Sequence, residues 1–194
     1  MKGIIFLDLD GVVNNTTDVD DELNINHGPM YIAIRNLDPM RRLFEKCKEN
    51  DIKIVISSTW SVFGFNKIYY FFKDLIDEEI LKEVMIDTTE YLIYDGSNHR
   101  SIEIAKYLFS DEKLRDLKNY LFIDDSLSEF TESDLNRLVH INQEIGLTVD
   151  KVDESIDIII NNKFIDKPTY KDQFSKEKLS DIMKMKAIFS KVER

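Results

Sequence analysis

Residues 3–11 read GIIFLDLDG, and this stretch decides the expected fold. The run from Gly3 to Leu9 is nearly all apolar, rich in isoleucine, and too short for an independent helix. It therefore predicts a strand that is buried on both faces. Asp8 and Asp10 stand two residues apart at the end of this strand, so their side chains are expected to point the same way. Gly11 then allows the backbone to turn sharply.

Apolar runs and amphipathic segments alternate along the rest of the chain. Further strands are predicted over 52–56, 84–87, 120–123 and 138–141, and helices over 37–47, 61–83, 100–110 and 149–160. Pro39 fits the first turn of the first helix, and Thr148 fits the N-cap of the last. Strands that alternate with helices predict an α/β fold with a parallel sheet.

Polar residues follow three of the predicted strands. They are Asp8 and Asp10, Ser57 and Ser58, and Asp124 and Asp125. In a parallel α/β sheet ligands bind beyond the carboxyl ends of the strands. We therefore expect these side chains to converge on one functional site.

Crowded carboxylates repel one another unless a cation lies between them, and Mg²⁺ prefers oxygen ligands. One carboxylate can attack phosphorus while a second transfers the proton. Ser57 and Ser58 offer hydroxyls and amides to a phosphate oxygen, although serine at this position also serves as a helix N-cap. For the cation that such a site needs, Arg100 is the first candidate and Lys106 the second.

Composition narrows the class of protein. With 43% hydrophobic and 32% charged residues, the 194-residue chain is expected to form a globular domain with a sizeable core. A net charge of −11 disfavours a sequence-independent coat on nucleic acid. One cysteine, no apolar run of membrane-spanning length and no signal peptide predict a cytoplasmic protein without membrane contact. The sequence predicts no particular oligomeric state.

Four stretches together resemble the haloacid dehalogenase (HAD) superfamily of phosphohydrolases. They are DLDGVVN at 8–14, IKIVISSTW at 52–60, the helix that Arg100 begins, and YLFIDDS at 120–126. The SSTW and R-x-x-E-I pieces make the chain more narrowly similar to the small HAD domains of the Swiss Army Knife RNA repair type. The resemblance covers residues 3–160.

The resemblance implies a three-layer, Rossmann-like parallel sheet with a minimal or small cap. The HAD-like domain is expected over 1–162, with a flap or small cap over 15–36. Residues 163–194 hold nine basic and five acidic residues and are expected to form a separate, partly helical tail, with a helix over 175–192.

The resemblance also implies roles for single residues. Asp8 is expected to be the nucleophile that forms an aspartyl-phosphate, and Asp10 the general acid and base with its main-chain carbonyl on Mg²⁺. Ser57 and Ser58 are expected to bind the phosphoryl group, and Arg100 takes the place usually held by a lysine. Asp8, Asp10, Asp124 and Asp125 are the expected metal residues. Asp125 is the expected direct ligand and Asp124 its support, with the reverse order left open.

The expected function is therefore Mg²⁺-dependent hydrolysis of a terminal phosphate on a nucleotide or nucleic acid. The alternatives are a generic small-molecule phosphomonoesterase and a catalytically idle HAD fold that serves as a binding or regulatory module. Ser61 departs from the subgroup, which commonly has arginine there. Trp60 is a candidate to stack on a base, although it also fits an ordinary core position.

Overall fold

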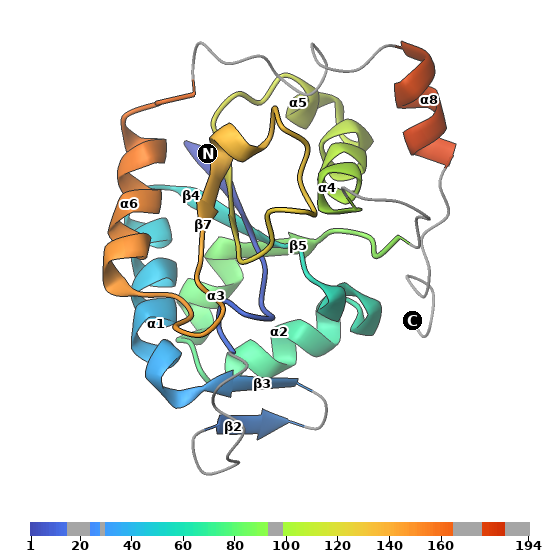
Figure 1. The fold of residues 1–194 in the computed structure, drawn as a ribbon. Coiled ribbons are helices and arrows are strands. Elements are labelled where there is room, and N and C mark those ends of the chain that lie inside the picture. The colour runs from blue at the N-terminus through green and yellow to red at the C-terminus, as the bar shows by residue number, and fades with distance from the viewer. Residues whose placement is uncertain (15–23, 28–29, 93–98, 165–175, 185–194) are drawn as a thin grey trace.

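The computed structural model describes residues 1–14, 24–27, 30–92, 99–164 and 176–184. In these ranges five parallel strands form a sheet in the order β5-β4-β1-β6-β7 (Figure 1). The strands are β1 (Gly3–Leu7), β4 (Ile52–Ile56), β5 (Met85–Thr88), β6 (Tyr120–Asp124) and β7 (Leu138–His140). The strand predicted from the opening sequence thus lies at the centre of the sheet.

Helices cover both faces of this sheet (Figure 1). On one face lie α1 (Ile34–Glu49), α2 (Phe65–Lys73), α3 (Glu78–Val84) and α6 (Val149–Ile160). On the other face α4 (His99–Ser110) packs beside α5 (Glu112–Arg115) and α8 (Lys176–Lys184). None of the helices in the described ranges is long and apolar enough to cross a membrane.

The side chains of β1 show why this strand must be central. Ile5 and Leu7 point into the core beneath α1 and α6, whereas Ile4 and Phe6 point into the core beneath α4. All four are at most 1% exposed. Because side chains alternate along a strand, an apolar residue at every position requires cover on both faces. The three-layer parallel fold predicted from the sequence is confirmed.

The first helix differs from the prediction at its start. It begins at Ile34, so Pro39 lies inside the helix and not in its first turn. β3 (Met30–Ala33) runs directly into the helix. Proline lacks the N–H that would complete a helical hydrogen bond at its position.

The helix predicted over 61–83 is divided into three pieces. A 3-10 helix, η2 (Thr59–Phe63), is followed by α2 and α3. Gly64 separates η2 from α2 with a φ of +78°, which a residue with a side chain rarely adopts. The Asp77 carboxylate accepts from two main-chain N–H groups and starts α3 as an N-cap. The predicted cap at Thr148 is confirmed, because its side chain accepts from the Lys151 amide.

The segment predicted as a flap contains an antiparallel hairpin. β2 (Asn24–His27) pairs with β3, and the last three residues of the predicted segment already belong to α1. Residues 15–23 and 28–29 lie outside the described residues. A substrate-covering role for this hairpin therefore stays a prediction.

Among the described residues beyond 162, two side chains belong to the core. Phe164 is 6% exposed and lies under the Arg137 guanidinium, and Ile182 of α8 is 2% exposed against the α4 side of the sheet. A second 3-10 helix, η3 (Leu135–Arg137), carries that arginine. The rest of the predicted tail, 165–175 and 185–194, lies outside the described residues, so its separateness stays a prediction.

Replacing Ile182 tests whether α8 is part of the fold. We expect Ile182→Ala to lower the free energy of unfolding by about 2–4 kcal/mol, since the methyl groups it removes are buried against α4. Urea denaturation measures the change. Met183→Ala is the matched control, because the Met183 side chain on the same turn is 45% exposed and should contribute much less. Equal stability of the wild type and both variants would show that α8 does not pack here.

Candidate active site

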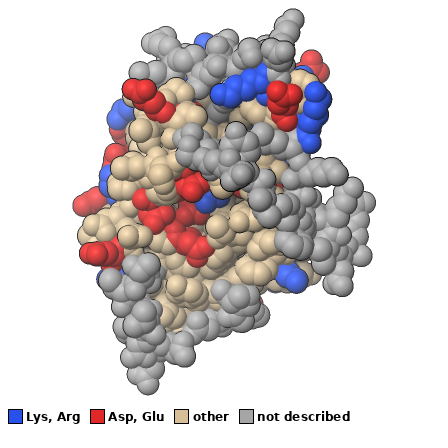
Figure 2. Space-filling view, turned by 45° about the vertical axis from the view of Figure 1, so that its right-hand side comes forward, with Lys and Arg blue, Asp and Glu red and all other residues tan. Residues whose placement is uncertain are grey.

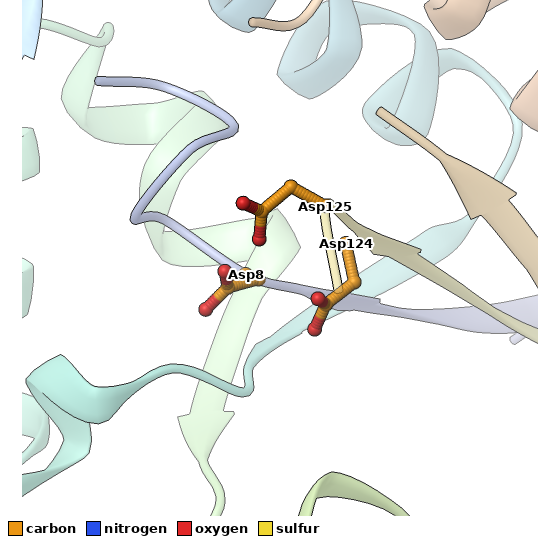
Figure 3. A group of neighbouring side chains, drawn as sticks. All are labelled: Asp8, Asp124 and Asp125. Carbon is orange, nitrogen blue, oxygen red and sulfur yellow. The ribbon is translucent and has the colours of Figure 1, made fainter. Parts of the chain in front are cut away.

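Three aspartates meet at the carboxyl ends of two neighbouring strands (Figure 3). Asp8 follows β1, Asp124 is the last residue of β6, and Asp125 comes next. The strands pair in parallel with Leu7 opposite Ile123, so their ends coincide. One carboxylate oxygen from each aspartate lies within 4.8 Å of the other two. The convergence predicted for these residues is therefore present.

Gly11 lets the loop after β1 approach this cluster. Its φ is +72°, and a Cβ added there would collide with the Asp125 carboxylate. The turn predicted from the glycine is confirmed. It requires glycine both for its backbone angle and for the close approach.

The guanidinium of Arg100 lies among the carboxylates. Arg100 stands in the first turn of α4 and is 8% exposed. Its Nη2 donates to Asp8 Oδ1, its Nε to Asp124 Oδ2 and its Nη1 to Glu103 Oε2, each at 3.2 Å. The rigid fork of arginine thus joins the ends of β1 and β6 to α4.

Burial dominates the electrostatics of the cluster. It raises the pKa of Asp8 well above its usual value and that of Asp124 to about 6, with the Arg100 charge opposing both shifts. Burial also raises the pKa of Asp125. For Arg100, burial alone would lower the pKa, but Asp8 and the other acidic neighbours raise it above its ordinary value. The carboxylates are therefore crowded and destabilised when charged, while the guanidinium stays charged.

A cavity of about 300 Å³ opens over these groups. Asp8, Asp10, Thr59 and Arg100 line it, together with Asp125. Figure 2 shows acidic side chains gathered around a hollow with a basic group inside it. A ligand entering the cavity reaches both the Asp8 carboxylate and the guanidinium.

The family of the chain follows from a match to a family model, and the matched residues include the acidic cluster and Arg100. A family model described as the HAD domain in Swiss Army Knife RNA repair proteins matches residues 4–152. The chain belongs to this family. The match runs from β1 into the start of α6 and so includes the whole acidic cluster. No match was found among curated proteins.

Asp10 of this HAD domain lines the cavity but is not one of the three clustered carboxylates. Its Oδ1 accepts from Asn14 Nδ2 and Trp60 Nε1, both at 2.9 Å, and its Oδ2 accepts from Thr59 Oγ1 at 2.6 Å. The side chain is thus held from the loop after β1 and from η2. Neither Asn14 nor Thr59 is predicted from the sequence as a partner of Asp10. Asn14 lies four residues away in the same loop, whereas Thr59 meets Asp10 only because the fold brings η2 to this loop.

The two serines after β4 have different environments. Ser57 is 1% exposed, and its hydroxyl has no hydrogen-bond partner among the described residues. The Ser58 hydroxyl accepts from the Trp60 amide as the N-cap of η2, and its hydrogen bond to Asp8 lowers the pKa of that carboxyl. The cap interpretation of the sequence is therefore confirmed for Ser58. Binding of a phosphoryl oxygen by Ser57 and Ser58 stays a prediction.

Of the two candidate cations, the HAD domain brings Arg100 to the carboxylates. Lys106 instead pairs with Glu90 at 2.6 Å and lines a different cavity. Glu103 was not singled out by the sequence analysis, although it stands three residues after Arg100 in the R-x-x-E-I stretch. It is 2% exposed, and its second oxygen accepts from the Leu92 amide. Glu103 thereby holds Nη1 of the Arg100 guanidinium in place.

Trp60 and Ser61 are turned into the protein. The indole is 4% exposed and packs edge-on against Phe71, with ring centroids 5.5 Å apart. The core interpretation of Trp60 is confirmed and the base-stacking interpretation is wrong, because the ring is buried. Ser61 is 5% exposed and its hydroxyl bonds with Thr88 Oγ1 at 2.6 Å.

The donor set of the cluster fits a hard divalent cation. Asp8, Asp124 and Asp125 supply oxygen ligands only, and their oxygens are close enough to share one ion. Magnesium prefers one or two carboxylates with water and substrate oxygens completing its shell. A bound cation would also offset the repulsion between these carboxylates and the cost of burying their charges.

Proposed function

We propose that this HAD domain is a Mg²⁺-dependent phosphohydrolase that forms an aspartyl-phosphate on Asp8. The observation that carries the proposal is the position of Asp8, which is buried, clustered with Asp124 and Asp125, and in contact with Arg100. A nucleophilic carboxylate needs this combination of fixed orientation and compensating charge.

In the proposed reaction an Asp8 oxygen bonds to phosphorus while the bond from phosphorus to the leaving oxygen breaks. Asp10 gives its proton to that oxygen. A water molecule then attacks the phosphorus of the aspartyl-phosphate, and its proton passes to Asp10. The bond between the Asp8 oxygen and phosphorus breaks, which regenerates the Asp8 carboxylate and releases inorganic phosphate. One carboxyl group therefore acts first as an acid and then as a base.

The other residues hold the phosphoryl group. Arg100 presents planar N–H donors and keeps Asp8 oriented through Oδ1. The unpartnered hydroxyl of Ser57 can donate to a phosphoryl oxygen, and Ser58 helps to orient Asp8. Arginine cannot act as the proton donor, which leaves that role to Asp10.

Asp8 and Asp125 are the proposed direct ligands of magnesium, with Asp124 in support and Asp10 contributing its main-chain carbonyl. Magnesium bound there supplies positive charge against the charge that develops on the transferring phosphoryl group. Asp124 suits a supporting role, because its Oδ2 accepts from Arg100 and its Oδ1 from the Ser126 amide at 2.8 Å.

We further propose a terminal phosphate on a nucleotide or a nucleic-acid end as the substrate. Membership in a family of RNA repair proteins supports this class. The acidic surroundings and the net charge of −11 oppose contact with a long phosphate backbone, whereas one terminal phosphate needs only the groups inside the cavity.

A phosphate-release screen tests the activity and the substrate class together. We expect hydrolysis of p-nitrophenyl phosphate with Mg²⁺, and a kcat/KM at least about tenfold higher for 3′- or 5′-phosphorylated short oligonucleotides or mononucleotides than for sugar phosphates. A preference of that size for sugar phosphates would instead indicate a generic phosphomonoesterase. Absence of turnover on every substrate would indicate a binding module.

Chelation is the control in the same screen. We expect excess chelator to abolish phosphate release and added Mg²⁺ to restore it, because the clustered carboxylates need a cation to bind an anionic substrate. Activity that is undiminished in chelator would contradict the metal assignment and leave the nucleophile assignment to be tested separately.

A further inference from the structure

Asp10 is held by side chains that the proposed reaction does not otherwise use. Both of its carboxylate oxygens are occupied: Oδ1 by Asn14 and Trp60, and Oδ2 by Thr59. The three donors come from two separate segments, the loop after β1 and η2. Asp10 and Thr59 line the same cavity as Asp8, so this arrangement faces the reacting groups.

The donors on Oδ1 are fixed in direction. The indole N–H of Trp60 can only donate, and packing against Phe71 holds the ring. The Asn14 amide is oriented by a second hydrogen bond, in which its Oδ1 accepts from the Gly11 amide at 2.9 Å. Its Nδ2 must therefore point at Asp10.

The contact on Oδ2 is different in kind. The Thr59 hydroxyl donates to Asp10 Oδ2, and a protonated carboxyl keeps acceptor capacity beside its single O–H. Thr59 can therefore go on donating to Asp10 in both halves of the reaction, which leaves the acid proton for the leaving oxygen, while Trp60 continues to hold the other oxygen. Thr59 is exposed and lines the cavity, so it contacts Asp10 from the side that faces the cavity.

We propose that Thr59 and Trp60 are positioning residues that aim Asp10 at the oxygen of the leaving group. This inference rests on the proposed function and deepens it. When the phosphorus–oxygen bond breaks, its electron pair stays on the leaving oxygen and the Asp10 proton is transferred there. A poor leaving group needs that proton far more than a good one does.

Two aryl phosphates of nearly the same shape separate this role from a general loss of structure. p-Nitrophenyl phosphate has a good leaving group and phenyl phosphate a poor one. We expect Thr59→Val and Trp60→Phe each to lower kcat/KM for phenyl phosphate about tenfold more than for p-nitrophenyl phosphate. Thr59→Ser keeps the hydroxyl and should recover most of the loss.

Ser61→Ala is the matched control. It removes a hydroxyl from the same 3-10 helix, but that hydroxyl bonds with Thr88 and not with Asp10. The ratio of the two kcat/KM values should therefore equal that of the wild type. Thermal melting of each variant shows whether the domain has folded.

The possible failures are distinct. A wild type that hydrolyses neither aryl phosphate with Mg²⁺ would overturn the proposed function. An active wild type whose Thr59→Val and Trp60→Phe variants lose equal activity on both substrates, or lose none, would overturn the positioning role alone. Failure of Thr59→Ser to recover activity would also overturn the role of the Thr59 hydroxyl.

Discussion

Asp8→Asn is expected to lower phosphatase turnover by about a thousandfold or more, because an amide is a poor nucleophile. The amide still offers an oxygen to Arg100, which donates to Asp8 Oδ1 in the wild type. The fold should therefore be kept. Phosphate release from p-nitrophenyl phosphate with Mg²⁺ measures the loss. Turnover near the wild-type rate would exclude Asp8 as the nucleophile.

The same substitution should stabilise the metal-free protein. Burial raises the pKa of Asp8 well above its ordinary value, so its charged form is disfavoured in the folded state, and each pKa unit corresponds to about 1.4 kcal/mol. A raised folded pKa gives stability that is present at low pH and lost as pH rises. The gain in the free energy of unfolding should thus be larger near about pH 8 than near about pH 5. Asp38→Asn is the control and should change the stability little, because the Asp38 side chain on α1 is 92% exposed and its contact with Arg41 is a long surface ion pair of 3.9 Å.

Arg100→Met should remove both activity and stability. We expect kcat to fall by about a hundredfold or more, because donors aimed at the phosphoryl group are lost. Without the guanidinium, Asp8, Asp124 and Glu103 remain buried near one another with no positive partner in these contacts. Breaking such a buried pair costs about 3–5 kcal/mol. Steady-state kinetics and urea denaturation without divalent cations measure the two losses.

The loss of stability in Arg100→Met should depend on pH. The Arg100 charge opposes the upward pKa shifts of Asp8 and Asp124, the second of which already reaches about 6. Its removal raises both further, and the folded protein then takes up more protons than the unfolded chain. The difference in the free energy of unfolding between the wild type and Arg100→Met should therefore shrink as pH falls from about 8 to about 5. A difference that grows on acidification would contradict the assigned ion pairs.

Arg100→Lys keeps the charge and provides the matched comparison. Arg100 contacts three carboxylates through three different nitrogens, and one ammonium group cannot reproduce that fork. We expect intermediate stability and activity. If lysine fully replaced arginine, charge alone and not the three-way contact would be the function of this position.

The strands and the acidic positions were predictable because their signals are local. An all-apolar run followed by aspartate, as in β1 and β6, indicates a buried strand whose end carries polar groups. The same local reasoning located Gly11 and the Thr148 cap correctly. It was wrong about the start of α1, because the preceding hairpin strand leads straight into the helix and proline is tolerated within it.

The sequence by itself thus determined the parallel sheet and placed Asp8, Asp124 and Asp125 at its carboxyl edge, since strand periodicity and chain order suffice for both. Tertiary structure alone decided which side chains hold them. Arg100 reaches the cluster and Lys106 does not, because the fold brings the first turn of α4 to the ends of β1 and β6, whereas it places Lys106 beside Glu90. Trp60 lies 50 positions from Asp10 and meets it only because β4 packs beside β1. Such contacts depend on how distant segments pack, and no local pattern encodes that.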